Sequence, residues 1–529
     1  MIESEYINIK WDAIVIGTGM GGSVCGYELS KKGKKVLFIE IGPYRRDSNI
    51  KNISKKLNSE VKDGYWPNRI KGNTTFGKLN IYPTMGYGAG GSTLLYAAQL
   101  ERFHSSDFEF QKFRQGKSNL PLRWPISYAE LAPFYKKAEI LLNVCGGIDK
   151  YQSAEFQKHL LPRDLSKIDN EYLSYINECG VDAYSSHFIE DITNECKGCG
   201  GLICPNSCRR DLKSICIEPA IKEYKANILS NAEVLSINMK ESVAKSVNVK
   251  VNENLVTINS KLVVVAAGAL FTPKILLNSK SDIFKRGLGN NYDLVGRNLM
   301  WHSSDFFFLR AKALRPIIPD NTKLISCNKF YEYNGVKLGT FQSGGSKIKA
   351  DQVKSFLIKN SKINPLLFIF RFEFFCSLAA KIAEYVGSTF EVYSTIVEDL
   401  PYLNNRVYID ESSDSGVSFD YSYRDELMER SKTLKILIKK FLKKNFWVLF
   451  ITGKNNLNWG HPSGTCRFGD SIENSVLDSK NCIHGVENVF VVDASFFPSS
   501  GGTNPSLTIA ANAIRVSNIM NTYLEESVD

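Results

Sequence analysis

The chain has 529 residues, of which 43% are hydrophobic and 23% are charged, and its formal net charge is +11. This length favours more than one domain or one large interleaved fold, and the apolar content supports a substantial core. The charge is mild for the length and no nucleic-acid-binding module is recognisable, so we expect no nucleic-acid partner. The sequence shows no internal repeat and no low-complexity tract.

The N-terminus lacks the basic region, apolar run and cleavage site of a secretory signal, which predicts a cytoplasmic protein. Twelve cysteines in so long a chain do not resemble a disulfide scaffold. Residues 365–375 form an apolar run that two charges interrupt and that is too short to span a bilayer. We expect this run to be buried; the alternative is an interfacial patch, so membrane contact is peripheral at most. The lysine-rich stretch 432–444 predicts an amphipathic helix packed on the protein.

A strand, a glycine-rich turn, a helix and a second strand are expected in succession from residue 12. Residues 12–16 are apolar and β-branched, as in a buried parallel strand. A helix fits residues 20–32, with Gly33 as its stop. Residues 35–39 predict a second buried strand that ends at Glu40. This order is typical of a dinucleotide-binding βαβ unit.

The turn between the first strand and the helix has glycines at G-x-G-x-x-G spacing, and each has a role. Gly17 permits the tight turn, Gly19 lets a pyrophosphate approach the backbone, and Gly22 lets helix and strand pack closely. The N-terminus of the helix stabilises the phosphates. Glu40 can accept hydrogen bonds from the adenosine ribose, and its negative charge argues against a 2′-phosphate. The motif alone does not separate FAD from NAD.

Further motifs occur in a fixed order along the rest of the chain. They lie in residues 86–93, 123–135, 263–273, 295–302, 398–407, 460–465 and 491–506. Together with the N-terminal unit, these segments resemble the glucose–methanol–choline (GMC) oxidoreductases over nearly the whole length of the chain. Several motifs in the order of the family are far more specific than any one of them.

The resemblance implies an α/β fold with two domains, each built from separate stretches of chain. A Rossmann-like FAD-binding domain is expected from residues 1–110, 215–300 and 455–529. An inserted α+β substrate domain, built on an antiparallel sheet, is expected from residues 111–214 and 301–454, with a cysteine-rich segment at 196–216. The cofactor implied is FAD.

The resemblance also implies where the flavin contacts lie. A helix beside the flavin is expected to begin in the second glycine motif and to donate backbone N–H groups from Gly90, Gly91, Ser92 and Thr93. Asp493 follows a strand-like run and is expected near the pyrophosphate or the ribityl chain.

Removing a hydride from an alcohol carbon requires a base for the hydroxyl proton and an acceptor for the hydride. Histidine suits the base role because its pKa lies near the operating pH, and the match to the H-P-x-G-T block of the family makes His461 that base. Asn504 matches the partner position, where its amide could hydrogen-bond the substrate oxygen. The alternative for Asn504 is a turn residue before a proline. For His302 we expect a structural role, with a direct catalytic role as the alternative.

A cysteine cluster with the spacing C-x2-C-x4-C-x3-C could surround one metal centre through Cys196, Cys199, Cys204 and Cys208. Part of this spacing looks like the iron–sulfur segment of bacterial membrane-linked sugar dehydrogenases. The alternatives are zinc or a loop without metal. An iron–sulfur centre would pass electrons to an acceptor protein or a quinone rather than to oxygen.

These features predict an FAD-dependent dehydrogenase or oxidase that takes a hydride from the CH–OH group of a small-molecule alcohol, of the sugar or polyol type. One alternative is a sterol or long-chain alcohol, because the phenylalanine-rich residues 368–375 could line an apolar pocket. Another is a non-redox FAD-binding lyase or a non-catalytic subunit on the same scaffold.

Overall fold

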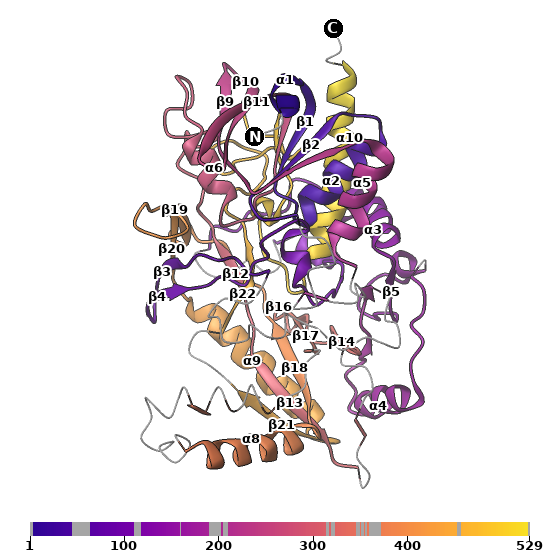
Figure 1. Cartoon of the computed structure of the whole chain (residues 1–529). Coiled ribbons are helices and arrows are strands. Elements are labelled where there is room, and N and C mark those ends of the chain that lie inside the picture. Colours follow the sequence, from indigo (N-terminus) through magenta and orange to yellow (C-terminus); the bar gives the residue numbers. More distant parts are fainter. Residues whose placement is uncertain are drawn as a thin grey trace.

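The computed structural model contains two large β-sheets with helices packed on them, and shorter strands connect the two (Figure 1). The described residues are 4–44, 64–110, 118–158, 160–189, 203–204, 210–313, 317–318, 323–344, 350, 354, 357–358, 372–451 and 456–526. Both termini of the described chain lie at the same end of the molecule, beside the first sheet (Figure 1).

The first sheet has seven strands in the order β8-β2-β1-β11-β10-β9, with β23 paired to β11. The strands are β1 (Trp11–Ile16), β2 (Val36–Glu40), β8 (Asn227–Ser230), β9 (Ala232–Lys240), β10 (Val243–Val251), β11 (Asn254–Val265) and β23 (Val489–Val491). Strands β8, β2, β1, β11 and β23 are parallel, and β11, β10 and β9 are antiparallel. The predicted βαβ unit is confirmed, since β1 is followed by a helix and then by β2.

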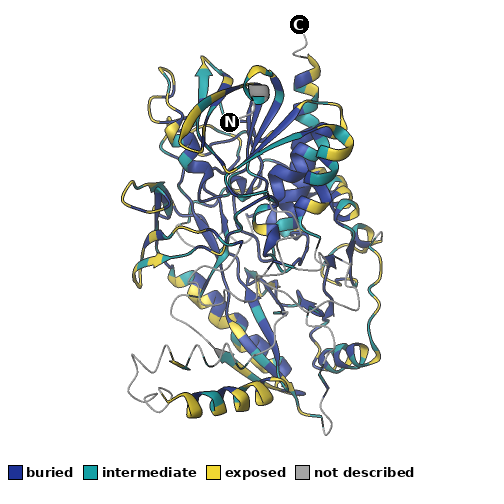
Figure 2. Cartoon of the chain, in the orientation of Figure 1, coloured by how far each residue is buried: buried dark blue, intermediate teal, exposed yellow. Residues whose placement is uncertain are grey.

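Helices cover this sheet and bury its apolar strands. They are α2 (Met20–Lys31), α5 (Glu218–Tyr224) and α10 (Ser506–Glu526), with α3 (Tyr128–Leu142) packed on α10, α1 (Ser4–Asn8) on β11 and α6 (Thr272–Asn278) on β9. Strands β1 and β2 are apolar along nearly their whole length because helices pack on them, and the exposed fraction of Ala13, Val15 and Leu37 is 0%. Figure 2 shows α2 and α10 as largely buried elements.

The second large sheet is antiparallel and has the order β21-β13-β18-β17-β14-β6. Its strands are β6 (Tyr184–Ser185), β13 (Phe306–Ala311), β14 (Ile325–Cys327), β17 (Thr340–Ser343), β18 (Glu391–Ile396) and β21 (Phe446–Ile451). One face carries Phe307, Phe341 and Tyr393, which share an apolar core with α9 (Asp425–Leu442). The opposite face is turned toward the first sheet and forms one wall of the cavity described below.

Short strands connect the two halves. A four-stranded sheet joins β3 (Ile70–Thr74) and β4 (Gly77–Ile81) to β19 (Arg406–Ile409) and β20 (Val417–Tyr421). Strand β12 (Met300–Ser303) pairs with β22 (Leu457–Ser463) between the large sheets. The remaining elements are α4 (Lys167–Asn177), α8 (Glu373–Gly387) and the strand pairs β5 (Val144–Cys145) with β7 (Phe188–Ile189) and β15 (Glu332–Tyr333) with β16 (Val336–Lys337). The predicted α/β fold with an antiparallel second sheet is therefore confirmed.

The two predictions about apolar and basic segments have different outcomes. The lysine-rich residues 432–444 fall almost entirely within α9, whose apolar side is buried, so the amphipathic helix is confirmed. Residues 365–371 lie outside the described residues. Phe374 and Phe375 lie in the first turn of α8 and are 72% and 45% exposed, so the expectation that this run is buried is wrong for its described part. Among the described residues, no helix has the length and apolar character needed to cross a membrane.

Candidate active site

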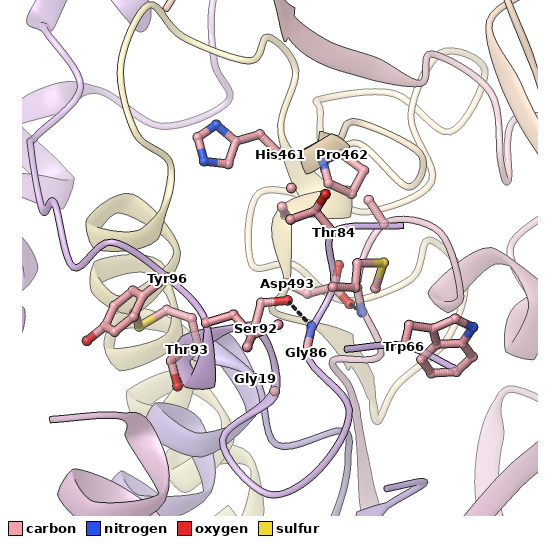
Figure 3. A pocket seen from close by; sticks show the side chains of 18 of the residues that line it. Gly19, Trp66, Thr84, Gly86, Ser92, Thr93, Tyr96, His461, Pro462 and Asp493 are labelled. Carbon is pink, nitrogen blue, oxygen red and sulfur yellow. Dashed lines mark hydrogen bonds between the residues drawn. The ribbon is translucent and has the colours of Figure 1, made fainter. Parts of the chain in front are cut away.

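A cavity of about 1,100 Å³ lies between the two large sheets. Most of the predicted nucleotide-binding residues and both predicted catalytic residues line this same cavity, including Gly19, Glu40, Asp493, His461 and Asn504. In the close view the β1–α2 turn and His461 lie on opposite sides of the space (Figure 3). The fold therefore brings the two ends of the sequence to one site.

The β1–α2 turn uses its three glycines in three different ways. Gly17 has a φ of +92°, and a Cβ there would lie 2.5 Å from the carbonyl oxygen of Ala266. A Cβ on Gly22 would lie 2.1 Å from the Gly17 oxygen, so helix and turn are in direct contact. A Cβ on Gly19 would meet no atom within 4 Å. The space beside Gly19, at the N-terminus of α2, is where a ligand can approach the backbone.

Glu40, at the end of β2, stabilises this turn through hydrogen bonds. Its carboxylate accepts hydrogen bonds from the Thr18 hydroxyl at 2.6 Å, the Thr18 amide at 3.1 Å and the Gly42 amide at 2.9 Å. Burial raises the pKa of Glu40, while these hydrogen bonds favour the charged form. The Gly88 amide also favours the charged form, so donors of the protein take up about four acceptor positions of the carboxylate, and a ribose hydroxyl would have to share one of them. That contact stays a prediction.

The second glycine motif differs from the expectation. Residues Gly91–Leu94 form a single 3₁₀ turn rather than the start of a longer helix, and Gly90 and Gly91 have φ values of +100° and +54°. The amides of Gly90, Gly91 and Thr93 donate to the Thr18 hydroxyl, the Gly88 carbonyl and the Gly90 carbonyl. These three N–H groups are thus used within the protein. The prediction that this segment donates backbone N–H groups to the flavin stays a prediction, and these three groups would share their hydrogen with the protein's own acceptors.

The 3₁₀ turn nevertheless lies directly against the nucleotide-binding turn. A Cβ on Gly91 would be 2.7 Å from the Gly19 Cα, and the Ser92 hydroxyl accepts a hydrogen bond from the Gly86 amide at 3.2 Å (Figure 3). The Thr93 hydroxyl donates to the Gly90 carbonyl at 2.6 Å and accepts from the Leu212 amide. Thr93 therefore holds the turn in place through its side chain.

Asp493 follows β23, next to the nucleotide-binding turn. Its carboxylate accepts hydrogen bonds from the Gly268 amide at 3.0 Å, the Thr272 hydroxyl at 2.5 Å and the Ser495 amide at 2.8 Å. Burial raises the pKa of Asp493, and these donors favour its charged form. Asp493 also lines the cavity, and its expected place near the cofactor stays a prediction.

The predicted base, His461, lies on β22 and is hydrogen-bonded to a second histidine on the neighbouring strand. The Nδ1 atoms of His461 and His302 are 2.9 Å apart. The Nε2 of His302 lies 3.1 Å from the Ser500 carbonyl oxygen and 2.9 Å from the Gly501 carbonyl oxygen. The sequence motif before His302 indicated a structural position, but not this contact across 159 residues.

These contacts define which ring nitrogens carry hydrogen. Carbonyl oxygens only accept, so the Nε2 of His302 must carry a hydrogen. Burial lowers the pKa of His302 to about 4, so the ring is neutral and its Nδ1 is an acceptor. The Nδ1 of His461 is consequently the donor in the pair. This tautomer leaves a lone pair on the Nε2 of His461, the arrangement a general base requires.

A neighbouring amide competes for the same ring nitrogen. The Nδ2 of Asn458 lies 3.2 Å from the Nδ1 of His461, while its Oδ1 accepts a hydrogen bond from the Gly460 amide at 3.1 Å. An amide nitrogen can donate only to an unprotonated Nδ1, which would place the hydrogen of His461 on Nε2. His302 and Asn458 therefore favour opposite tautomers, and the closer His302 contact favours the basic Nε2.

The electrostatic surroundings keep this base neutral. Burial, together with the His302 ring and the Lys323 ammonium group, holds the pKa of His461 well below its ordinary value. Burial also lowers the pKa of Lys323 to about 8. A neutral imidazole can accept a proton, so the site keeps His461 in its active form at neutral and moderately acidic pH.

Asn504 lies at the end of a loop that buried polar groups hold in place. The Gly502 amide donates to the Tyr331 hydroxyl at 2.8 Å, and that hydroxyl donates to Asp107 at 2.6 Å. Lys337 forms a buried ion pair with Asp107. The Oδ1 of Asn504 is buried and has no hydrogen-bond partner among the described residues. An unpaired amide oxygen in a cavity wall fits a contact with a ligand.

Polar side chains extend across the antiparallel sheet where it faces the cavity. The register places Ser326 beside Gln342, Gln342 beside Ser394 and Ser394 beside Phe306. The Oε1 of Gln342 is buried and lacks a hydrogen-bond partner among the described residues. Lys323 lines the cavity from the strand end nearby and donates to the Ser343 carbonyl at 3.1 Å. No sequence motif marks these residues, because the sheet assembles them from separate strands.

The predicted metal site falls largely outside the described part of the chain. Cys196, Cys199 and Cys208 are not among the described residues, and Cys204 is. Within the described residues, no group of three His, Cys, Asp or Glu side chains is arranged to hold a metal ion. The metal centre stays a prediction.

Comparison with known families identifies the chain. A GMC oxidoreductase N-terminal model matches residues 12–304, and the corresponding C-terminal model matches residues 407–513. The chain belongs to the GMC oxidoreductase family. The GMC family and its flavoprotein structures imply FAD as the cofactor, and the curated relatives are oxidases and dehydrogenases. The chain is therefore an oxidoreductase acting on CH–OH groups.

Three similar curated GMC proteins cover almost the whole chain. The 6'''-hydroxyparomomycin C oxidase of Streptomyces lividus is 24% identical over 97% of this chain and 92% of its own. Paromamine 6'-oxidase of Streptomyces fradiae is 25% identical over 96% and 90%. The 2-methyl-1,2-propanediol dehydrogenase of Mycolicibacterium austroafricanum is 25% identical over 98% and 96%.

Solved structures support the fold. Pyridoxine 4-oxidase from Mesorbium loti matches with a TM-score of 0.66 and 17% identity, over 97% of this chain and 99% of that one. Formate oxidase matches with a TM-score of 0.64 and 15% identity, over 98% and 99%.

The residues present fit the cofactor that the GMC family implies. Open space beside the Gly19 backbone at a helix N-terminus suits a pyrophosphate, and Glu40 and Asp493 line the cavity next to it. The cavity continues without interruption to His461. A dinucleotide held at this turn would extend toward the histidine pair.

Proposed function

We propose that the protein oxidises the CH–OH group of a polar, polyhydroxylated alcohol, with His461 as the general base. FAD, when bound, supplies the hydride acceptor. The observation that carries this proposal is the His302–His461 contact, because it supports an unprotonated Nε2 on a histidine that lines the same cavity as the nucleotide-binding turn.

The chain's own groups account for the handling of the alcohol proton. The Nε2 of His461 accepts the hydroxyl proton as the carbon loses its hydride, and the positive charge that develops is stabilised because Nδ1–H already donates to His302. The side-chain amide of Asn504 hydrogen-bonds the same substrate oxygen and orients the carbon toward the acceptor. His302 acts through His461 and is a positioning residue.

The polar sheet face supports a polyhydroxylated substrate over a long-chain alcohol. Gln342 and Ser394 present hydrogen-bonding groups to the cavity, and the Lys323 ammonium group lines it as well. If an aliphatic chain filled this space, these polar groups would lose their water and gain no hydrogen bonds in exchange, which is unfavourable. One relative, 2-methyl-1,2-propanediol dehydrogenase, is named for a short diol, which agrees with this choice.

Anaerobic mixing of the FAD-loaded protein with a panel of alcohols tests the proposal without knowledge of the electron acceptor. The panel contains monosaccharides, amino sugars, short diols and long-chain alcohols. We expect the oxidised flavin absorbance to bleach with sugars or diols and not with aliphatic alcohols. Bleaching by long-chain alcohols alone would contradict the substrate class. No bleaching by any alcohol, with FAD bound, would contradict the oxidation itself.

The electron acceptor stays a prediction, with oxygen, a quinone and an acceptor protein such as a cytochrome as the alternatives. The comparisons give the iron–sulfur centre no support, and it forms no part of the proposed function.

A further inference from the structure

The exposed side of α8 carries a group of large apolar residues. Its large apolar residues are exposed by 45% to 78%: Phe374 72%, Phe375 45%, Leu378 47%, Ile382 55%, Tyr385 78% and Val386 46%. Soluble proteins do expose single apolar residues, but a continuous group of this kind marks an interaction surface.

The helical spacing places these residues on one stripe. Phe374, Leu378, Ile382 and Tyr385 follow one another at intervals of four, four and three residues. The buried positions of α8 are the small residues Cys376, Ala380 and Gly387. The helix thus packs on the protein through small side chains and turns its large apolar side chains outward, the reverse of an ordinary surface helix. Figure 2 shows α8 as an exposed helix at the end of the molecule far from the termini.

The edge of the antiparallel sheet extends this surface. Trp447 and Leu449 on the edge strand β21 are 62% and 58% exposed. The register places Leu449 beside Phe308 on β13, and the Phe308 ring lies 6.4 Å from that of Phe390, three residues after α8. The C-terminal end of α8 therefore lies beside β13, the strand that pairs with β21. We call the six residues of the α8 stripe, together with Trp447 and Leu449, the apolar face.

The surroundings of the apolar face are mainly basic. Lys381 lies at the border of the α8 stripe, and the Lys312 ammonium group lies 5.0 Å from the centre of the Trp447 ring. Glu373 pairs with Lys354 at 2.9 Å, which leaves Glu384 as the other acidic residue of α8. Lys443 and Lys444 are exposed shortly before β21, and the Lys312 ammonium group donates to the Lys443 carbonyl at 2.5 Å.

We propose that the apolar face binds the surface of an anionic lipid bilayer, with α8 lying in the plane of the headgroups. Apolar side chains on one stripe, basic residues beside them and aromatic rings with a polar tip, such as Tyr385 and Trp447, are the features of an interfacial helix. The basic residues would face anionic headgroups. In a two-fold contact between copies of this chain, the same basic border would face itself, which is unfavourable. This argument favours a lipid surface over a second copy.

Co-sedimentation of the FAD-loaded, full-length protein with vesicles tests this proposal. One set of vesicles is phosphatidylcholine alone, and the other contains about one third phosphatidylglycerol. The variant Leu378→Ser/Ile382→Ser removes the centre of the stripe. The matched control is Ile140→Ser/Leu255→Ser, which changes residues with exposures of 65% and 66% on α3 and β11.

We expect the wild-type protein and the control variant to sediment with anionic vesicles and to be released by salt. The stripe variant should bind about tenfold more weakly. Its flavin content should be unchanged because α8 does not line the cavity. Equal sedimentation of the stripe and control variants would overturn the proposal. So would a wild-type dimer in light scattering that the stripe variant dissociates, because the surface would then bind a second copy.

Discussion

Because His302 and Asn458 both contact the Nδ1 of His461 and favour opposite tautomers, His302→Ala should change the tautomer of His461. Without His302, the amide of Asn458 at 3.2 Å becomes the remaining partner of this nitrogen. The amide can only donate, so it favours the tautomer with hydrogen on Nε2. That tautomer cannot accept a proton from the alcohol. The variant should therefore lose base function while His461 stays in place.

The magnitude follows from the hydrogen bond that is removed. A buried donor left without its acceptor costs about 1–3 kcal/mol, and this cost is what now disfavours the active tautomer. With about 1.4 kcal/mol for each factor of ten, flavin reduction should slow by about 5- to 150-fold. His302→Asn should lose less, because its side-chain oxygen can still accept from His461.

A second change should restore the activity. In His302→Ala/Asn458→Asp, one carboxylate oxygen can keep the bond from the Gly460 amide and the other can accept from the Nδ1–H of His461. The assay is anaerobic stopped-flow reduction of bound flavin, with FAD content and melting temperature as controls. Wild-type rates in His302→Ala, or a double variant slower than the single one, would refute the tautomer argument.

Four other substitutions have distinct outcomes. Gly19→Ala should weaken FAD binding by about tenfold without changing the melting temperature of the apoprotein. Gly22→Ala, whose Cβ would lie 2.1 Å from a backbone oxygen, should lower that melting temperature. If the two variants changed FAD affinity and melting temperature equally, the roles assigned to the two glycines would be wrong. Lys323→Met removes a cation that lowers the pKa of His461, so the acid limb of flavin reduction should move to higher pH; an unmoved limb would exclude this coupling. Tyr331→Phe leaves a buried amide and carboxylate without their shared partner, so the free energy of unfolding in denaturant should fall by about 1–3 kcal/mol, and an unchanged value would show that the loop is held by other contacts.

Local signals in the sequence predicted the nucleotide-binding unit closely. The predicted helix at residues 20–32 is α2 (Met20–Lys31), and the predicted end of the second strand at Glu40 is the end of β2. Glycine spacing, apolar strands and a terminal acidic residue are all read from neighbouring positions. The second glycine motif was predicted less well. The positive φ values of Gly90 and Gly91 do not fit an α-helix, and the segment forms a 3₁₀ turn instead.

Long-range contacts explain what the sequence could not show. His302 meets His461 because β12 pairs with β22, and neither strand contains a signal of that pairing. Lys323 reaches the cavity only through the packing of the antiparallel sheet. The apolar run that enters α8 illustrates a different limit, since composition identifies an apolar helix face but not whether the protein or another surface covers it.

The account depends most on His461 as the base facing a flavin held at the β1–α2 turn. The direct test is the anaerobic rate of flavin reduction in His461→Ala, measured with an alcohol that bleaches the wild-type protein. We expect the variant to retain its yellow FAD and to be reduced about 10² to 10⁴ times more slowly. A rate close to that of the wild-type protein, or a wild-type protein that binds no FAD when it is supplied in excess, would contradict the account.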